Sequence, residues 1–293
     1  MLKPPLSGDS TAKRVSYVRH AGSSEALKEM AVDANRPQPC FCTLRDDTNS
    51  LRQCVDIQRQ IWAYSAEDLW PLRSFLVCRR IGGQVLGALD QNSSVIGFLN
   101  AFPAVRGGTV YLHSQLMGVL PEYQGLGIGR MLKLAQREEA LTRNIDYVEW
   151  TFDPTEVRNA YFNIERLGAI CRRHSANDYG ITSSPLHVGM PTDRLIAEWH
   201  LSSSSVEAAA NGKPHLKVSS VELLAVEIPL EIGQLKSSHP QVAVKLLQEL
   251  RQQMVDLLAK NYRVSGFQID RERAKAQYLL EPFPPPQSDV SGG

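Results

Sequence analysis

Long apolar runs, a secretion signal and an excess of either charge are all missing from this sequence. No stretch approaches the roughly 18 consecutive apolar residues of a membrane-spanning helix, and the charged N-terminus lacks the apolar segment of a signal peptide. The 32 Lys and Arg nearly balance the 31 Asp and Glu, and the two signs are interspersed. We therefore expect a cytoplasmic protein with no membrane association and no basic surface for nucleic acid or anionic lipid.

Cysteines are few, and their spacing shows no pairing. The five are odd in number and scattered, which fits neither a disulfide framework nor a zinc site. Cys40 and Cys42 could bind a metal together with distant partners, although packing beside an apolar strand is the simpler interpretation. We expect free thiols and no metal.

The chain is long enough to bury a substantial core. Its 293 residues and 43% apolar content predict one large or two modest domains. A run of small polar residues near 202–214 is typical of a flexible linker. We divide the chain into a loosely ordered N-terminal arm, a main domain, a linker, a C-terminal subdomain and a disordered tail, at residues 1–38, 39–201, 202–216, 217–282 and 283–293.

Hydrophobic periodicity predicts mixed α/β structure in the main domain. Two helices lead into a meander of three strands, followed by a fourth strand, a glycine-rich segment, a helix, a fifth strand and another helix. The predicted helices are residues 51–64, 66–70, 128–143 and about 154–167, and the predicted strands are residues 74–80, 84–90, 95–102, 109–120, 146–152, 169–173 and 194–201. Beyond the linker, a strand at 218–228, a helix at 240–260 and strands at 263–269 and 276–280 form a βαββ unit.

The fourth of these helices has a capping signature at its start. Asp153 can cap it, Pro154 suits the first helical position and Glu156 can complete a capping box. The apolar stripe predicted to be buried comprises Val157, Ala160, Tyr161 and Ile164, and the polar residues expected on the opposite side are Asn159, Asn163 and Arg166.

The segment between the fourth strand and the next helix is rich in glycine. It contains Gln124, Gly125, Leu126, Gly127, Ile128, Gly129 and Arg130. Glycines let the backbone turn tightly and let a ligand approach, while the first amides of a helix point outward unpaired. Such a cradle suits a pyrophosphate, with side-chain donors added by Gln124 and Arg130. An ordinary glycine-rich turn is the alternative.

Two nucleotide motifs fit this segment poorly. No Gly-Lys-Ser/Thr follows the loop, which excludes the usual phosphate-binding loop of NTPases. A dinucleotide fingerprint needs a third glycine at the position of Arg130, and four residues separate the strand end from Gly125. Glu149 could supply the acid of that motif, so a dinucleotide-binding site remains an alternative interpretation.

The spacing Gln124-x-x-Gly127-x-Gly129 resembles the Gln/Arg-x-x-Gly-x-Gly/Ala signature of GNAT acetyltransferases. The order of predicted elements over residues 41–201 is also similar to that family, and the run LHSQLMGVLPEYQGLGIGRMLKLAQRE resembles a bacterial subgroup of predicted acetyltransferases with a C-terminal βαββ extension. The resemblance implies an α/β (α+β) fold whose central, mostly antiparallel mixed sheet is splayed between its fourth and fifth strands, with flanking helices.

The resemblance also implies a binding site for acetyl-CoA as co-substrate. The pantetheine arm would enter the gap between the two splayed strands beside Met117, Gly118 and Val119, and the backbone N–H of Val119 would act as the oxyanion donor. The pyrophosphate would bind the amides of residues 124–130, and Asn159 or Asn163 could bind the pantetheine.

Catalytic residues are less fully specified by the resemblance. Along the fourth strand, Tyr111, His113, Gln115 and Met117 share one face by the period of two, and His113 lies near the position at which several family members have a glutamate base. Glu149 on the fifth strand is the second candidate for the base. The family's usual tyrosine acid is absent, because Ile164 occupies its position, and Tyr161 lies one turn earlier. A hydrogen-bonded structural role remains the alternative for His113, and a core position remains the alternative for Tyr161. A solvated position is the alternative for Glu149 and for the two asparagines.

These features predict an acetyl-CoA-dependent N-acetyltransferase acting on a primary amine of a small molecule or protein. The alternatives are a non-catalytic acyl-CoA sensor or scaffold and a transferase that uses a longer acyl donor. The C-terminal subdomain could cover the acceptor pocket or pair two subunits as a homodimer.

Overall fold

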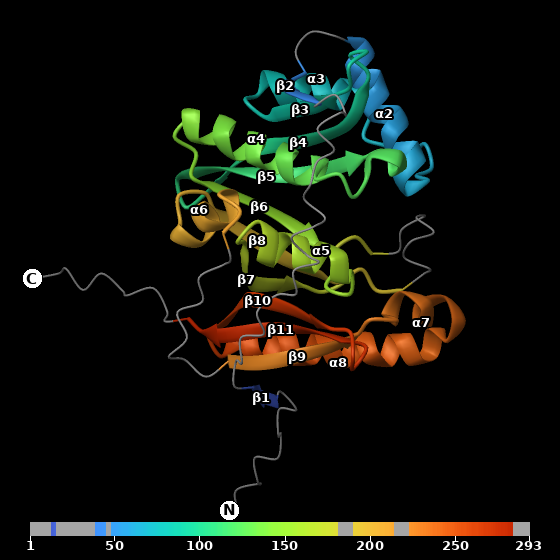
Figure 1. Cartoon of the computed structure of the whole chain (residues 1–293), viewed down its shortest axis with the longest axis vertical. Helices are drawn as coiled ribbons and strands as arrows, with labels where there is room; N and C mark the ends of the chain where they lie inside the picture. Colours follow the sequence, from blue (N-terminus) through green and yellow to red (C-terminus); the bar gives the residue numbers. More distant parts are fainter. Residues whose placement is uncertain (1–12, 16–38, 45–47, 181–189, 214–222, 284–293) are drawn as a thin grey trace, which may run out of the picture.

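Eleven strands of the described residues form one sheet. The computed structural model describes residues 13–15, 39–44, 48–180, 190–213 and 223–283. The strand order in that part of the chain is β1-β9-β11-β10-β7-β8-β6-β5-β4-β3-β2, and Figure 1 shows it from β2 at the top to β1 at the bottom. The strands are β1 (Lys13–Val15), β2 (Cys40–Thr43), β3 (Gln84–Leu89), β4 (Val95–Arg106), β5 (Thr109–Val119), β6 (Tyr147–Phe152), β7 (Ile170–Ser175), β8 (Arg194–His200), β9 (Leu223–Pro229), β10 (Tyr262–Asp270) and β11 (Lys275–Pro282).

Helices flank this sheet. They are α2 (Thr48–Trp62), α3 (Leu72–Arg80), η1 (Pro121–Tyr123), α4 (Ile128–Thr142), α5 (Val157–Tyr161), η2 (Phe162–Arg166), α6 (Ser204–Ala210), α7 (Ile232–Ser238) and α8 (Pro240–Ala259). Neighbouring described strands are antiparallel except β5 and β6, which are parallel. The predicted mixed, mostly antiparallel sheet with flanking helices is therefore confirmed.

Side chains alternate between the two faces of the sheet along each strand, so their contacts show which helices cover which face. In β3, Val85 packs with Phe75 of α3 and Phe98 of β4. The adjacent Leu86 points the other way and packs with Leu132 of α4. Helices α2 and α3 therefore cover one face of this end of the sheet, and α4 covers the opposite face.

The C-terminal segment extends the same sheet. Strand β10 pairs with β7 through Val264 and Cys171. The largest core runs across this junction, from Trp150 of β6 to Met254 of α8 and Tyr278 of β11. The two predicted parts of the chain thus share both a sheet and a hydrophobic core.

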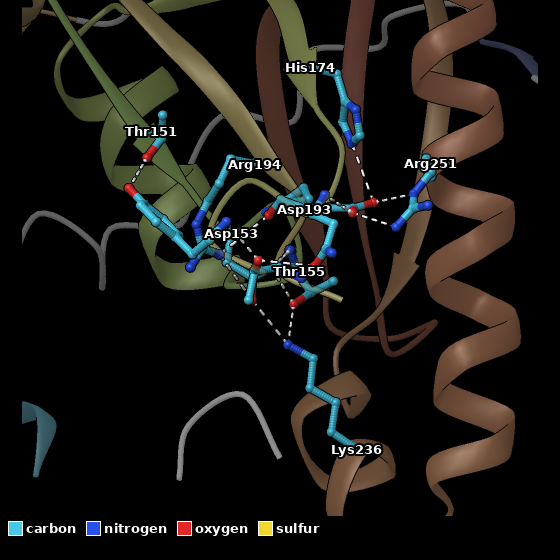
Figure 2. A network of polar contacts seen from close by, with 12 residues as sticks. Thr151, Asp153, Thr155, His174, Asp193, Arg194, Lys236 and Arg251 are labelled. Carbon is cyan, nitrogen blue, oxygen red and sulfur yellow. Dashed lines mark hydrogen bonds and ion pairs between the residues drawn. The ribbon is translucent and has the colours of Figure 1, made fainter. Parts of the chain in front are cut away.

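Polar contacts reinforce the junction, as Figure 2 shows. Arg251 of α8 donates to both carboxylate oxygens of Asp193 at 2.6 and 2.5 Å. Lys236 of α7 lies 3.1 Å from Asp153 Oδ2 and 2.7 Å from Thr155 Oγ1. Both basic residues come from the C-terminal segment, and their partners come from the main domain.

The second helix is displaced from its predicted position. Residues 74–80, predicted as a strand, belong to α3, whereas residues 66–70, predicted as a helix, are turn and coil. Pro71 is the N-cap of α3; it precedes a helix instead of ending one. Phe75 and Cys78 are buried three residues apart, a spacing that a short apolar run does not separate from a strand pattern.

The helix after β6 begins later than predicted and contains a π-helical turn. Glu156 is the N-cap of α5 without a side-chain hydrogen bond, and the Asp153 carboxylate instead accepts from the backbone N–H and hydroxyl of Thr155 at 2.8 and 2.6 Å. The π-helical η2 follows directly and rotates the residues after it relative to an α-helix. Tyr161, which was predicted to be buried, is 39% exposed in α5, and Asn163, which was predicted to be exposed, is 2% exposed in η2, so both predictions were wrong.

The segment predicted as a flexible linker contains a packed helix. The Ser203 hydroxyl caps α6 by accepting from the N–H of Val206 at 3.4 Å, and Val206 is 1% exposed in the main core. The sequence pattern missed α6 and α7. Part of the predicted strand at 218–228 lies outside the described residues, and β9 begins at Leu223.

No helix in the described ranges combines the length and apolar character required to cross a bilayer.

Candidate active site

Strands β5 and β6 separate soon after they meet. Their register comprises only two pairs, Leu112 with Val148 and His113 with Glu149, although β5 continues to Val119 and β6 to Phe152. Within the described chain, the last six residues of β5 thus have no register partner on β6. This divergence is the splayed pair that the resemblance implies.

The open edge of β5 exposes particular backbone groups. The N–H of Leu120 donates to Ile96 O of β4 at 2.9 Å, so the polar groups of residue 120 point toward β4. Because these groups alternate in direction along a strand, those of Met117 and Val119 point into the gap beside β6. An extended amide-containing chain could pair with them there.

A β-bulge interrupts the alternation of side chains on β5. The register with β4 shifts between Asn100 and Ala101, leaving Gln115 unmatched. Ser114 faces α4, where Lys133 binds it, while His113 faces the opposite side. On the C-terminal side of the bulge, Met117 packs with the hydrophobic cluster that contains Leu132 of α4. The predicted single face containing His113 and Met117 was therefore wrong.

Gly118 lies in close contact with side chains of α2. A Cβ at this position would lie 2.8 Å from Ile61 Cδ1 and 3.2 Å from Trp62 Cη2. The glycine thus lets α2 lie directly on the strand that carries the open backbone edge.

The glycine-rich loop forms an open turn at the end of this gap. Gly125 and Gly127 both have φ of +79°, and a Cβ on either would meet no atom within 4 Å. Gln124 Nε2 donates to Val119 O at 3.0 Å and ties the loop to the end of β5, and Leu126 is 44% exposed. These features match a backbone that a ligand can approach closely.

The N-terminus of α4 has the properties of an anion site. Gly127 is the N-cap, and no side chain caps the helix. The first regular helical bond runs from Met131 N to Gly127 O, so the amides of Ile128, Gly129 and Arg130 precede the regular ladder. Their partial positive charge favours a phosphate group.

The Arg130 side chain has a different role from the predicted one. Its Nη2 donates to Ala209 O at 2.6 Å and Ala210 O at 3.0 Å, at the C-terminus of α6. Burial and the neighbouring Arg166 lower the pKa of Arg130. Only the backbone amide of this residue fits the predicted anion cradle.

The two asparagines on the following helix lie in different environments. Asn159 is exposed. Asn163 is buried beside β6, where its Oδ1 accepts from Trp150 Nε1 at 3.3 Å. No partner for Asn163 Nδ2 is found in the described part of the structure. An unsatisfied buried donor is costly, so this amide fits the carbonyl of a ligand lying along β6.

His113 and Glu149 face each other where the two strands meet. His113 Nδ1 lies 3.7 Å from Glu149 Oε1, and the His113 side chain is 30% exposed. Arg106 donates to both Glu149 oxygens at 2.8 Å. Arg173 and the Tyr147 hydroxyl donate to Oε2 at 2.6 and 3.0 Å.

The groups around Glu149 keep its carboxylate ionised. Burial raises the pKa of Glu149, but hydrogen bonds from His113, Arg106 and Arg173 lower it more, so the pKa lies well below the usual range. A carboxylate held ionised in this way is a weak base, and its geometry suits it to orient His113.

Sequence reasoning missed the arginines and the tyrosine around Glu149. Arg106 and Arg173 are 43 and 24 residues away from Glu149 along the chain, so no local spacing joins them. The available signal was Glu149 itself, a carboxylate between apolar residues of a predicted strand, because such a group needs partners when buried. Tyr161, the predicted acid, is exposed on α5.

Comparison with known proteins finds a family model that matches part of the chain. Residues 49–168 match the model of the acetyltransferase (GNAT) family. Similar solved structures include a provisionally assigned acetyltransferase from Acinetobacter baylyi (16% identity, 58% of this chain and 96% of that chain, TM-score 0.47). They also include Arabidopsis thaliana NAA60 in complex with acetyl-CoA (16%, 56% and 99%, 0.46) and an aminoglycoside 6′-acetyltransferase type Ii (16%, 56% and 98%, 0.44). No curated protein sequence matches the chain.

Proposed function

We propose that the protein is an N-acetyltransferase that transfers the acetyl group of acetyl-CoA to a primary amine, a proposal supported by the match of residues 49–168 to the GNAT acetyltransferase model. The observation that carries this proposal is the continuity of the β5–β6 gap with the glycine-rich loop. Gln124 joins the two through its bond to Val119 O. A long ligand with an anionic end and an amide-containing arm fits such a path.

The chain's own backbone supplies the binding groups. The amides of residues 125–130 hold the diphosphate at the start of α4, whereas the Gln124 N–H, expected to join them, already donates to Pro121 O at 3.2 Å. Met117 pairs with the arm, and the N–H of Val119, whose carbonyl is bound by Gln124, polarises the reacting carbonyl. Acetyl-CoA, when bound, supplies a thioester that is already activated, so the protein mainly aligns the amine and removes its proton.

His113 is the general base in this proposal. Glu149 Oε1 lies 3.7 Å from His113 Nδ1 and favours the tautomer that has its proton on Nδ1, which leaves Nε2 free to take a proton from the acceptor ammonium or amine, directly or through water. The fixed negative charge of Glu149 stabilises the imidazolium that forms. Glu149 therefore acts as a positioning residue for His113.

Protonation of the departing thiolate is assigned to water. Ile164 stands where the family's tyrosine acid would be, and it is 0% exposed in the core. Tyr161 is exposed on α5, and we expect Tyr161→Phe to retain activity.

Thiol release from acetyl-CoA over a panel of primary amines tests the reaction. We expect His113→Ala to lower kcat/KM by about 10²–10⁴-fold and to leave the Kd for CoA unchanged in titration calorimetry. CoA binding without turnover on any amine would favour a non-catalytic acyl-CoA sensor, which the missing tyrosine acid also supports. Thermal shifts with acetyl-, succinyl- and long-chain acyl-CoA would identify a longer acyl donor.

Binding of CoA has its own test in the glycine loop. Gly127→Glu places a carboxylate in the cradle and should abolish CoA binding. Gly82→Glu is the matched control, because Gly82 also has a positive φ, +87°, and open space around it but lies in the turn after α3. Equal CoA affinity in wild type and Gly127→Glu would refute the proposal.

A further inference from the structure

A chain of alternating charges lies on the sheet face that carries His113. It runs from Arg106 to Glu149, then to Arg173, Glu198 and Arg172. Glu149 and Glu198 are directly paired in the register of β6 and β8. This row of charges thus draws on β4, β6, β8 and β7 and begins beside the proposed base.

The acidic and the basic side chains in this row of charges are buried to very different degrees. The side chains of Glu149 and Glu198 are 6% and 0% exposed, whereas those of Arg106, Arg172 and Arg173 are 51%, 38% and 39% exposed. Three guanidinium groups also outnumber two carboxylates. A molecule approaching this face therefore meets half-exposed positive charge, with the negative charge beneath it.

A β-bulge brings the two adjacent arginines together. The register of β7 with β8 shifts between Ile170 and Arg173, which lets Arg172 and Arg173 both turn toward Glu198. Arg172 uses Nε and Nη2 on Glu198. Arg173 uses Nε on Glu198 and Nη2 on Glu149 and Tyr147.

One guanidinium nitrogen of each arginine takes no part in these contacts. No hydrogen bond from Nη1 of Arg172 or Arg173 is found to any described residue, and each Nη1 carries two N–H groups. Adjacent guanidinium groups with unused donors suit a bidentate anion such as a carboxylate or phosphate. Phe283, whose ring centroid lies 5.0 Å from Arg172 Cζ, holds that side chain in place.

From this geometry we propose that the acceptor amine carries an anionic oxygen group, which Arg172 and Arg173 bind while the amine lies at His113. The inference rests on the proposed acetyl transfer and names the class of acceptor. Glu149 is on the strand next to His113 and Glu198 is one strand further. The arginines belong to β7, beyond β8, but Arg173 reaches back to Glu149 at 2.6 Å, so with strands about 4.8 Å apart the anion lies roughly 10 Å from the amine.

Matched acceptors test the inference directly. The probes are 5-aminopentanoate, 3-aminopropyl phosphate and pentylamine, each measured for thiol release and for binding in the presence of CoA. We expect one or both anionic amines to bind and react roughly 10–100-fold better than pentylamine, as charge-assisted hydrogen bonds imply. The carboxylate and phosphate arms show which anion is preferred.

A variant separates recognition from catalysis. Arg172→Gln should abolish the preference for anionic amines and leave activity on pentylamine unchanged, because Arg173 still holds Glu198 and Glu149. Arg263→Gln is the control, since Arg263 packs on the same Phe283 ring at 4.9 Å but pairs with Glu281. Thermal melting checks that both variants fold.

The outcomes distinguish the inference from the function on which it rests. Equal use of the three amines by wild type, or equal losses on all three in Arg172→Gln, would overturn the anionic acceptor and leave acetyl transfer standing. Absence of CoA binding would refute the proposed function instead. Without turnover, the binding preference and its loss in Arg172→Gln still decide the inference.

Discussion

Glu149 shows how one buried side chain joins stability to function. It receives hydrogen bonds from two arginines and a tyrosine and faces His113 at 3.7 Å. Removing its charge would leave those donors without their acceptor and His113 without its orienting partner. The same substitution should therefore change both folding and catalysis.

We expect Glu149→Gln to lower the free energy of unfolding at pH 7 by about 1–3 kcal/mol. The pKa of Glu149 in the fold lies well below its usual range. The carboxylate therefore stabilises the fold above the unfolded pKa of about 4.3, and this contribution is lost as the pH falls below that value. Urea unfolding from pH 7 to pH 3 should show the wild type losing its advantage over the variant in acid. A difference that stays constant with pH would contradict this account.

Lys133 is a buried cation without a carboxylate partner among the described residues. Its Nζ donates to Ser114 Oγ and Gln136 Oε1 at 3.0 Å and lies 3.6 Å from the centroid of the Trp150 ring. Burial lowers the pKa of Lys133 well below its ordinary value. The side chain thus places a titratable group directly under the diverging strands.

The pH dependence of a Lys133→Met variant should reveal this group. Because the folded pKa lies below the unfolded value of about 10.4, the unfolded chain binds more protons, and wild-type stability rises with pH through that range. We expect the wild type to gain stability relative to Lys133→Met between pH 7 and pH 10, measured by urea unfolding. Lys260→Met, at an exposed lysine at the end of α8, should show no such trend.

At the scale of elements, two glycines with similar dihedral angles are held by different neighbours. Gly168 ends the π-helical segment with φ of +75°, and a Cβ there would lie 2.9 Å from Ser205 O of α6. Gly82 has φ of +87° and open space. The first glycine lets α6 pack against the end of η2, and the second only makes a turn.

Alanine substitution should separate strain from packing. Gly82→Ala should cost about 1–2 kcal/mol through its backbone conformation alone. Gly168→Ala should cost more, because the backbone of α6 must also move. Thermal or urea unfolding of both variants measures the difference, and equal losses would show that α6 contributes little to this end of the core.

Long periodic elements were predictable from the sequence, and short apolar ones were not. Helices α4 and α8 follow their predicted ranges closely because each buries a regular stripe over several turns. The nine-residue α3 was mistaken for a strand. The π-turn depends on partners far away in sequence, since Glu165 accepts from the N–H of Phe267 at 2.6 Å, 102 residues later.

The candidate site likewise has one part that was predictable from the sequence and another that was not. The glycine loop was predictable because its residues are contiguous and glycine has a local conformational role. The bulge at Gln115, the burial of Asn163 and the arginines on Glu149 depend on tertiary pairing, and no spacing in the sequence encodes them.

At the scale of the whole molecule, the C-terminal segment is joined to the main domain by charge as well as by the sheet. His174 Nε2 lies 3.5 Å from Asp193 Oδ2, beside the Arg251 contacts. Burial raises the pKa of Asp193, but His174, Arg251 and the backbone N–H of Asn177 lower it more, so the pKa lies well below its usual range. Lys236 similarly holds Asp153, next to the turn that precedes α5.

These contacts between the C-terminal segment and the main domain should make the molecule unfold as one unit. All four tryptophans lie between Trp62 and Trp199, so their fluorescence reports on the main domain, while Arg251 belongs to α8. If the two parts are coupled, Arg251→Gln should lower the midpoint of the fluorescence transition and of the far-ultraviolet circular dichroism transition equally, by about 1–3 kcal/mol in stability. Because Asp193 stabilises the fold only above its unfolded pKa of about 3.9, the effect should fade below that pH.

An unchanged fluorescence transition in Arg251→Gln, with a separate loss of dichroism, would mean that the C-terminal segment unfolds on its own. Arg271→Gln provides the control, since Arg271 is exposed in the turn between β10 and β11. The shared sheet favours the single transition, because β10 pairs with β7 and the core from Trp150 to Tyr278 is continuous. Neither part can lose its strands at this junction without exposing apolar surface of the other.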